Sequence, residues 1–351
     1  MNKKIFLIFI LIAVIVGICV GLLVLFNKLP SDSSDTGNTM KENIRIGFSL
    51  GTSQEERWQK DVSNFVERAK ELEAIVEVKY SGEDPKLQIS QAENLIIGGV
   101  KVLVVVANDS ASASQIVDMA HKAGIKVIAY DRMIDKSDVD LYVTFDSREI
   151  GKLQAQEVLN VSKGSVAYIG GSPTDNNALL LKEGTMKILD PLIKNKSAKL
   201  VVDSFSLGWQ PEEAYKTIHT YLASGKKIDA VIAANDGTAG GVIKALKEYG
   251  LAGKVPVSGQ DADLVACQRV IAGTQTMTVY KSLKKLAYAA AEAAVVFAEG
   301  NTPKINGTIN NGKNEVPSYF LTPILVTKEN MDTTVIADGF HTQEEVYGKS
   351  L

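Results

Sequence analysis

The stretch "KVIAYDRMI" (126–134) places two charged residues directly after a buried strand. The apolar run 127–129 predicts a strand inside the core, and Asp131 and Arg132 follow without a run of surface residues between them. An acid and a base at this point are either an ion pair that closes a loop, worth under about 1 kcal/mol at a surface, or part of a binding site. The remainder of the sequence decides between the two interpretations.

From Ile44 onward, short apolar segments alternate with amphipathic ones whose apolar residues recur at helical spacing. This alternation predicts parallel sheets covered by helices on both faces. So many strands exceed one ordinary sheet and predict two doubly wound α/β lobes of similar size. The predicted strands are IRIGFS (44–49), IVEVKY (75–80), VLVVVA (102–107), KVIAY (126–130), LYVTF (141–145), SVAYIGG (165–171), KLVVDSF (199–205), AVIAA (230–234), VPVSG (255–259) and TMTVY (276–280).

Polar side chains or tryptophans follow most of these predicted strands. In open α/β sheets the ligand crevice lies beyond the carboxyl ends of the strands, so these residues are expected to converge. They are Arg57, Trp58, Asn108, Asp109, Asp131, Arg132, Asp175, Asn176, Asn177, Trp209, Asn235, Asp236, Gln260, Asp261 and Lys281.

Some of these residues also have ordinary explanations. Trp58 continues the apolar stripe of its helix, and Asn235 or Asp261 fits a helix cap. Trp209 is harder to explain in this way, because it lies in a loop just ahead of a helix that begins near Pro211. The convergence of the whole set on one edge of two sheets favours a binding site.

The residue types at these strand ends suit a carbohydrate. A pyranose has apolar faces that tryptophan rings cover, and the two tryptophans of the chain fall one in each half. Carboxylates and amides accept hydrogen bonds from hydroxyls, while Arg, Lys and Asn donate to them. The sequence therefore predicts a sugar site, with no cofactor.

Other classes of function have less support. A net charge of −3 without a basic block gives no support for nucleic-acid binding. Two cysteines and three separated histidines predict neither a disulfide framework nor a metal site. No dinucleotide, Walker or nucleophile-elbow motif occurs. Paired carboxylates for glycoside hydrolysis remain open at Asp131 and Asp261.

The N-terminal segment predicts a membrane anchor. Ile5 to Phe26 are apolar without a charge, and about 20 such residues span a bilayer. Basic residues in 1–4 predict a cytoplasmic tip, and the polar stretch 27–43 predicts a flexible linker. The alternatives are a cleaved signal peptide or a lipid on Cys19. The expected location is a single-pass cell-membrane protein with an extracellular domain, in a bacterium without an outer membrane.

Six motifs resemble one known family. They are ERWQKD (56–61), AYDRMI (129–134), GGSPTDNNA (170–178), NDGTAGG (235–241), SGQDADL (258–264) and AGTQTMTVYK (272–281). From Ile44 to the C-terminus the chain resembles the periplasmic sugar-binding proteins of the ribose-binding type, and among them the members that bind D-xylose.

The resemblance implies two Rossmann-like lobes joined by a hinge of three crossings, the type I fold. It divides the chain into an N-terminal lobe of 44–146 plus 281–310 and a C-terminal lobe of 147–280 plus 311–351. The crossings are expected near 145–147, 280–282 and 310–317. The implied sugar-binding residues are Arg57, Trp58, Asp131, Arg132, Asn177, Trp209, Asn235, Asp261 and Lys281, with Asp109, Asp175 and Gln260 as weaker candidates.

The resemblance also implies a function. The expected ligand is D-xylose, with another pentose or hexose as the alternative. The expected partner is an integral-membrane protein, either an ABC permease or a sensor histidine kinase. The rival classes are a sugar-processing enzyme and a repressor of the lactose-repressor type, which shares the two-lobed core but needs a helix-turn-helix where the apolar segment 5–26 stands.

Overall fold

The computed structural model describes residues 44–53, 55 and 57–348. The predicted cytoplasmic tip (1–4), membrane anchor (5–26) and linker (27–43) lie outside these residues. Within the part of the chain that the structure describes, no helix combines the length and the apolar character needed to cross a membrane.

The first lobe is built on a seven-stranded sheet with the order β10-β11-β5-β4-β3-β1-β2. All of its neighbouring strands are parallel except β10, which is antiparallel to β11. The strands are β1 (Ile44–Leu50), β2 (Ala74–Tyr80), β3 (Val102–Val106), β4 (Lys126–Tyr130), β5 (Leu141–Phe145), β10 (Gly307–Asn310) and β11 (Glu315–Leu321).

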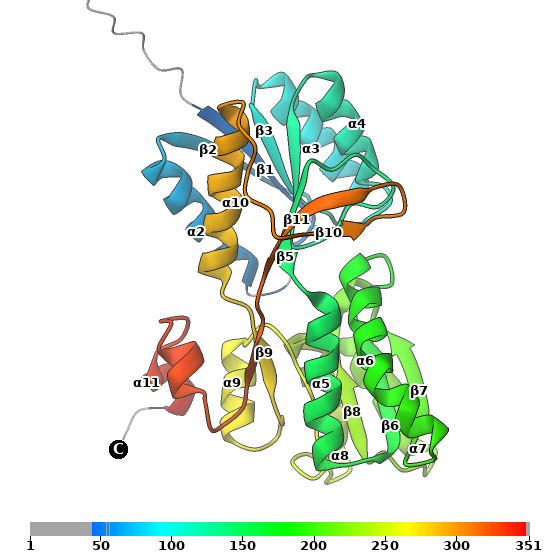
Figure 1. Cartoon of the computed structure of the whole chain (residues 1–351). Helices are drawn as coiled ribbons and strands as arrows, with labels where there is room; N and C mark the ends of the chain where they lie inside the picture. The colour runs from blue at the N-terminus through cyan, green and yellow to red at the C-terminus, as the bar shows by residue number, and fades with distance from the viewer. Residues whose placement is uncertain (1–43, 54, 56, 349–351) are drawn as a thin grey trace, which may run out of the picture. The chain divides into compact units, whose positions relative to one another are not determined.

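Helices cover both faces of this sheet, which explains its apolar strands. In β3 every residue is buried. Val104 packs into the core beneath α2 (Arg57–Glu71) and α10 (Leu283–Ala298), whereas Leu103 and Val105 pack into the core beneath α3 (Pro85–Ile97) and α4 (Ser114–Lys122). Figure 1 shows α2 and α10 side by side and α3 and α4 on the opposite side. The alternation of faces along one strand therefore serves two cores.

The second lobe contains a parallel three-stranded sheet with the order β7-β6-β8 and an antiparallel pair, β12-β9. Its strands are β6 (Gly164–Gly170), β7 (Ala198–Phe205), β8 (Ala230–Ala233), β9 (Thr278–Tyr280) and β12 (Ile324–Val326). Its helices are α5 (Ser147–Val161), α6 (Asn176–Lys194), η1 (Leu207–Trp209), α7 (Pro211–Ala223), α8 (Asp236–Glu248), α9 (Leu264–Ile271), η2 (Asp332–Ile336) and α11 (Gln343–Tyr347).

The predicted strand at 255–259 is wrong. Only isolated bridges form there, between Val257 and Val231 of β8 and between Val255 and Ala252. Pro256 has no backbone N–H to give to a ladder. The segment still lies beside β8, because Val231 N donates to Pro256 O at 2.9 Å. Like a strand, it therefore runs beside β8 up to the loop that carries Asp261.

Three crossings connect the lobes (Figure 1). The first joins β5 to α5, the second joins β9 to α10, and the third joins β11 to β12. The third differs from the expected crossing near 310–317, because β11 pairs with β5 and belongs to the first lobe. Val316 is buried in the same core as Tyr142. The predicted boundary at 310/311 therefore lies too early, and the chain leaves the first lobe only after Leu321.

Two glycines let α5 and α6 approach closely. A Cβ on Gly151 of α5 would lie 2.0 Å from Leu181 O, and a Cβ on Gly184 of α6 would lie 2.0 Å from Arg148 O. The contact is reciprocal and involves backbone atoms, so neither helix can yield locally. These helices position Ser147 and Asn177 at the edge of the cleft.

We expect Gly184→Ala to lower the free energy of unfolding by roughly 1–3 kcal/mol, because the methyl group forces the two helices apart. Urea denaturation followed by circular dichroism measures the change. Gly237→Ala is the matched control: its nearest neighbours would lie 3.6 Å from the added Cβ, so it is expected to be neutral or stabilising. A Gly184→Ala variant as stable as the control would contradict this account of the helix contact.

Candidate functional site

A pocket lies where the strand ends of the two lobes meet. All nine predicted sugar-binding residues line it, together with the weaker candidates Asp175 and Gln260. Asp109 lies outside and instead accepts a bond from Ser112 N at 2.7 Å in its own turn. The full lining is Glu55, Arg57, Trp58, Asp131, Arg132, Thr144, Phe145, Ser147, Ile150, Asp175, Asn177, Trp209, Asn235, Gln260, Asp261 and Lys281.

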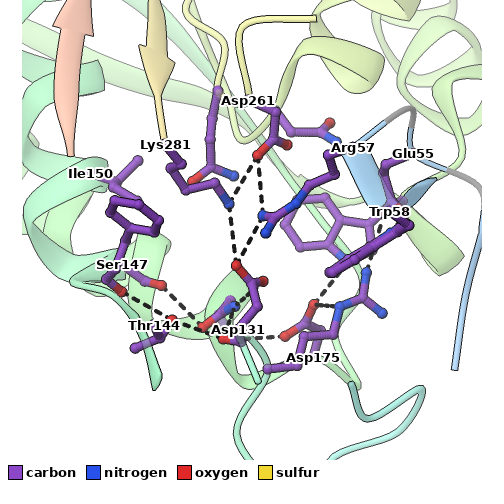
Figure 2. Close-up of a pocket in the computed structure, with 16 residues that line it drawn as sticks. Glu55, Arg57, Trp58, Asp131, Thr144, Ser147, Ile150, Asp175, Asp261 and Lys281 are labelled. Carbon is purple, nitrogen blue, oxygen red and sulfur yellow. Dashed lines mark hydrogen bonds and ion pairs between the residues drawn. The ribbon is translucent and has the colours of Figure 1, made fainter. Parts of the chain in front are cut away.

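Asp131 leaves β4 in a left-handed conformation with φ at 61°. Its N–H donates to Val143 O at 2.9 Å. Its carbonyl accepts from Tyr142 Oη at 2.7 Å, Thr144 Oγ1 at 2.9 Å and Asn177 Nδ2 at 2.9 Å. These bonds fix a backbone conformation that is unfavourable for a residue with a side chain. The Asp131 carboxylate is thereby held at the pocket (Figure 2).

Asp131 does not pair with its sequence neighbour Arg132. Its carboxylate lies 2.9 Å from Arg57 Nη1. Arg132 instead places Nε 3.0 Å from Asp175 Oδ2 in the second lobe and Nη2 3.3 Å from Glu55 Oε1. The adjacent acid and base of "AYDRMI" are therefore two separate elements of the pocket.

Arg57 is surrounded by three carboxylates from different segments. Its Nε lies 2.9 Å from Asp61 Oδ2, one helical turn along α2, and its Nη1 lies 2.9 Å from Asp131 and 3.5 Å from Asp261 Oδ1. Burial alone lowers the pKa of Arg57, but Asp131, Asp61 and Asp261 raise it well above its ordinary value. Arg57 is therefore a permanent cation that contacts acids of both lobes.

Lys281 provides a second cation between the lobes. Its Nζ lies 2.9 Å from Asp261 Oδ1 and 3.7 Å from Asp131 Oδ2. Asp261 Oδ1 is buried and accepts no well-directed hydrogen bond, although both cations lie within ion-pair distance. Figure 2 shows Lys281, Asp131 and Asp261 pointing toward one another. A hydroxyl that reaches this oxygen would find an acceptor with a free direction.

The two tryptophans are each fixed by an acid. Trp58 donates its indole N–H to Glu55, and Trp209 Nε1 donates to Asp175 Oδ2 at 3.1 Å. The guanidinium groups of Arg57 and Arg132 lie 4.5 Å and 5.3 Å from the centre of the Trp58 ring. Trp58 thus lines the pocket and also belongs to the core of the first lobe, as both of its predicted roles required.

The amide side chains combine local and pocket roles. Asn235 caps α8 through a capping box with Thr238, and it also lines the pocket. Asn177 Oδ1 accepts from Tyr142 Oη at 3.1 Å and from Ser147 Oγ at 3.0 Å. The interpretation as a cap and the interpretation as a site residue were therefore not exclusive.

Five lining residues were not predicted: Glu55, Thr144, Phe145, Ser147 and Ile150. Thr144 and Phe145 are the last two residues of β5, and Ser147 and Ile150 lie in the first turn of α5. The rule of strand ends, applied to "LYVTFDS" (141–147), points to Ser147 but not to Ile150. Asp61 was also missed. It does not line the pocket, but it holds Arg57 and accepts a hydrogen bond from Tyr130 Oη.

The pocket combines charged side chains with two tryptophan rings. Across residues 44–53, 55 and 57–348, no group of three or more His, Cys, Asp or Glu side chains is arranged to hold a metal ion. Each cation of the pocket lies close to a carboxylate, with Arg57–Asp131, Arg132–Asp175 and Lys281–Asp261 at 2.9, 3.0 and 2.9 Å.

A polar pocket between two doubly wound lobes defines a two-lobed binding protein, and comparison with known proteins agrees. The chain belongs to the periplasmic binding protein family: the model of the periplasmic binding protein domain matches residues 46–302. It is 47% identical over 307 residues to the D-xylose-binding periplasmic protein of Escherichia coli (strain K12), covering 87% of this chain and 93% of that protein. The protein of the same name from Haemophilus influenzae is 46% identical over 308 residues, with 87% and 93% covered.

A solved structure has the same fold. It is an ABC transporter solute-binding protein from Clostridium phytofermentans with bound β-D-glucose. It is 31% identical to this chain, with a TM-score of 0.80, and the match covers 86% of this chain and 99% of that one.

These comparisons correct the predicted location. Both D-xylose-binding relatives are periplasmic proteins, and they align with most of this chain. The prediction of a single-pass cell-membrane protein with an extracellular domain is therefore wrong.

We expect Asp131 to contribute stability that depends on pH. Burial alone raises the pKa of Asp131, but Arg57, Lys281 and Arg132 together lower it from 3.8 to about 2. A lowered pKa in the folded state means that the contribution is full above pH 4 and is lost as the pH falls through about 2. The shift corresponds to about 2 kcal/mol.

Denaturation of the wild type and of Asp131→Asn between pH 5 and pH 2 measures this contribution. The difference between their free energies of unfolding is expected to shrink by about 2 kcal/mol across that range. Asp61 and Asp175 are the acids to correct for in this difference, because burial raises the pKa of each and the charge of Asp131 raises it further. A difference that stays constant down to pH 2 would show that the ion pairs of Asp131 do not stabilise the fold.

Proposed function

We propose that this chain binds one molecule of D-xylose between its two lobes and releases it unchanged. The observation that carries the proposal is the composition of the pocket: seven charged side chains, six of which form three close ion pairs, with a tryptophan from each lobe. The similarity to two D-xylose-binding periplasmic proteins at 46–47% identity supports the choice of sugar.

The charge pairing disfavours an anionic ligand. Because each pocket cation already has a carboxylate within about 3 Å, an anion in this buried site would find no unpaired cation. A sugar hydroxyl both donates and accepts, so it can lie between a cation and an acid and satisfy both.

The same contacts support closure of the lobes around the ligand. Arg57 and Arg132 of the first lobe reach Asp261 and Asp175 of the second. Ser110 N in the first lobe donates to Thr174 O in the second at 3.1 Å. A ligand in the pocket contacts both lobes only when they are closed, and the three crossings are the segments about which they would separate.

The bound form is expected to act through an integral-membrane partner. An ABC permease is the first candidate, because the solved relative at 31% identity is a solute-binding protein of an ABC transporter. A sensor histidine kinase is the alternative. Uptake of labelled xylose in cells that express the chain with either candidate partner, compared with induction of a xylose-responsive gene, separates the two.

We expect calorimetric titration of the chain to show one D-xylose per chain. Trp58→Ala and Trp209→Ala are each expected to weaken binding by about 1–3 kcal/mol, roughly 5- to 150-fold, through lost contact with the sugar ring. Tyr249→Ala is the control, because Tyr249 is a 40% exposed aromatic residue outside the pocket. Absence of heat at millimolar xylose would reject the assignment. Appearance of any product from xylose or a xyloside would indicate an enzyme.

We expect the radius of gyration from small-angle scattering to fall when xylose is added, because the sugar stabilises the closed arrangement of the lobes. The measurement compares the wild type with Asp261→Ala, which removes the acid that Arg57 and Lys281 reach across the cleft. A radius that is the same with and without saturating xylose in the wild type would argue against closure.

A further inference from the structure

The loop that carries Asp261 has an unfavourable backbone. Asp261 and Ala262 are consecutive residues with φ at 99° and 53°. Conformations of this kind cost about 1–3 kcal/mol each for residues with side chains, and they persist only where the surroundings hold them. Something must therefore fix this loop for Asp261 to face the pocket.

The carboxylate of Asp236 is the group around which the loop is built. Asp236 is 1% exposed and lies outside the pocket lining. Its Oδ2 accepts from Asp263 N at 3.0 Å, just after the two strained residues. Its own N–H donates to Gln260 O at 2.9 Å, just before them. One residue thus holds both ends of the segment that presents Asp261.

The same carboxylate also reaches the strand that leads to Lys281. Thr278 Oγ1 in β9 donates to Asp236 Oδ2 at 2.9 Å and accepts from Ala262 N at 3.2 Å. Gln275 Nε2 donates to Asp236 Oδ1 at 2.7 Å. Because β9 ends at Tyr280, its position determines where Lys281 enters the pocket. Asp236 also follows directly after the pocket residue Asn235.

The Asp236 carboxylate is packed closely against the backbone at Gly259 and the side chain of Gln275. A Cβ on Gly259 would lie 1.9 Å from Asp236 Oδ1 and 2.3 Å from Gln275 Nε2. Arg269 completes the arrangement from α9: its Nε donates to Gln275 Oε1 at 2.9 Å and its Nη2 donates to Asp236 O at 2.8 Å. The orientation of the Gln275 amide is thus determined by the Arg269 guanidinium on one side and the Asp236 carboxyl group on the other.

We propose that Asp236 is a positioning residue for the sugar site, whose carboxylate sets the relative placement of Asn235, Asp261 and Lys281. This inference rests on the proposed function and deepens it. Three pocket residues come from three separate segments, and Asp236 bonds to two of these segments and belongs to the third. Removal of the Asp236 carboxylate leaves the pocket side chains present but displaces them. Sugar affinity therefore falls by more than the loss of folding stability alone would cause.

The first test compares Asp236→Asn with the wild type by calorimetric titration with D-xylose and by thermal unfolding. The Asn amide has the same shape as the carboxylate, but its NH2 group donates where a carboxylate oxygen accepted. This NH2 group then faces either Gln275 Nε2 or the donors Asp263 N and Thr278 Oγ1. We expect affinity to fall roughly tenfold to a hundredfold, as for misplaced binding groups. Asp229→Asn is the matched control, because Asp229 accepts from Ser165 N at 2.9 Å at the opposite end of β6 and β8. It is expected to lose stability and keep its affinity.

Rescue separates positioning from a general loss of fold. Asp236→Asn combined with Gln275→Glu exchanges donor and acceptor, so that residue 275 accepts from both residue 236 and Arg269. This double variant is expected to recover part of the lost affinity, although the bond from Gln275 Nε2 to Met277 O at 3.0 Å is lost.

Two less disruptive substitutions of Thr278 test the inference if Asp236→Asn does not fold. Thr278→Val removes the hydroxyl between Asp236 and Ala262 and is expected to weaken xylose binding, whereas Thr278→Ser retains the hydroxyl and is expected to bind as the wild type does. Equal affinity of Thr278→Val and Thr278→Ser, or wild-type affinity in Asp236→Asn, would overturn the inference alone. A wild-type chain that does not bind xylose would overturn the proposed function and the inference with it.

Discussion

Three carboxylates around the guanidinium of Arg57 connect the helix, the strand ends and the two lobes of this protein. An isolated buried cation costs several kcal/mol, and Arg57 is 2% exposed. Asp61 and Asp131 balance it within the first lobe, and Asp261 reaches it from the second. The requirement that this charge be paired constrains where β4 ends, how α2 is rotated and how the second lobe faces the first.

The backbone meets this requirement in the same way in both lobes. Asp131 and Asp261 each follow a core segment, each adopts a positive φ, and each donates its N–H to a valine carbonyl, Val143 O at 2.9 Å and Val279 O at 2.8 Å. An extended residue at either position would continue along its strand and direct its carboxylate away from the crevice. The strained conformation turns the side chain toward the opposite lobe, and the rigid strands and helices around it stabilise that conformation.

Much of this site could be predicted because the rule of strand ends depends on local sequence. Apolar strands can be predicted from the sequence. In a parallel sheet the residue after each strand lies at the edge where ligands bind, whichever strands are its neighbours. Residues that hold other pocket residues in place, without lining the pocket themselves, cannot be predicted by this rule. Asp61 lies in the middle of a helix. Asp236 does follow a predicted strand, but it does not line the pocket, and only the fold shows that its carboxyl group bonds to the loop of Asp261. Pairing across a long separation explains the misplaced third crossing, since nothing local to β11 indicates that it joins β5.

The ion pairs of the pocket also determine how selective it can be. When the lobes are closed, the cations and acids of the pocket contact each other directly. The binding free energy of a ligand then comes from the hydrogen bonds that its hydroxyls add to these ion pairs. A ligand that lacks one hydroxyl loses a hydrogen bond to a charged group, and such bonds are stronger than those between neutral groups. Asp261 Oδ1, which accepts no directed hydrogen bond, is a place where this discrimination would operate, because it faces both Arg57 and Lys281. The geometry of its loop, and hence of Asp236, therefore matters for selectivity as much as the identity of the side chain that touches the sugar.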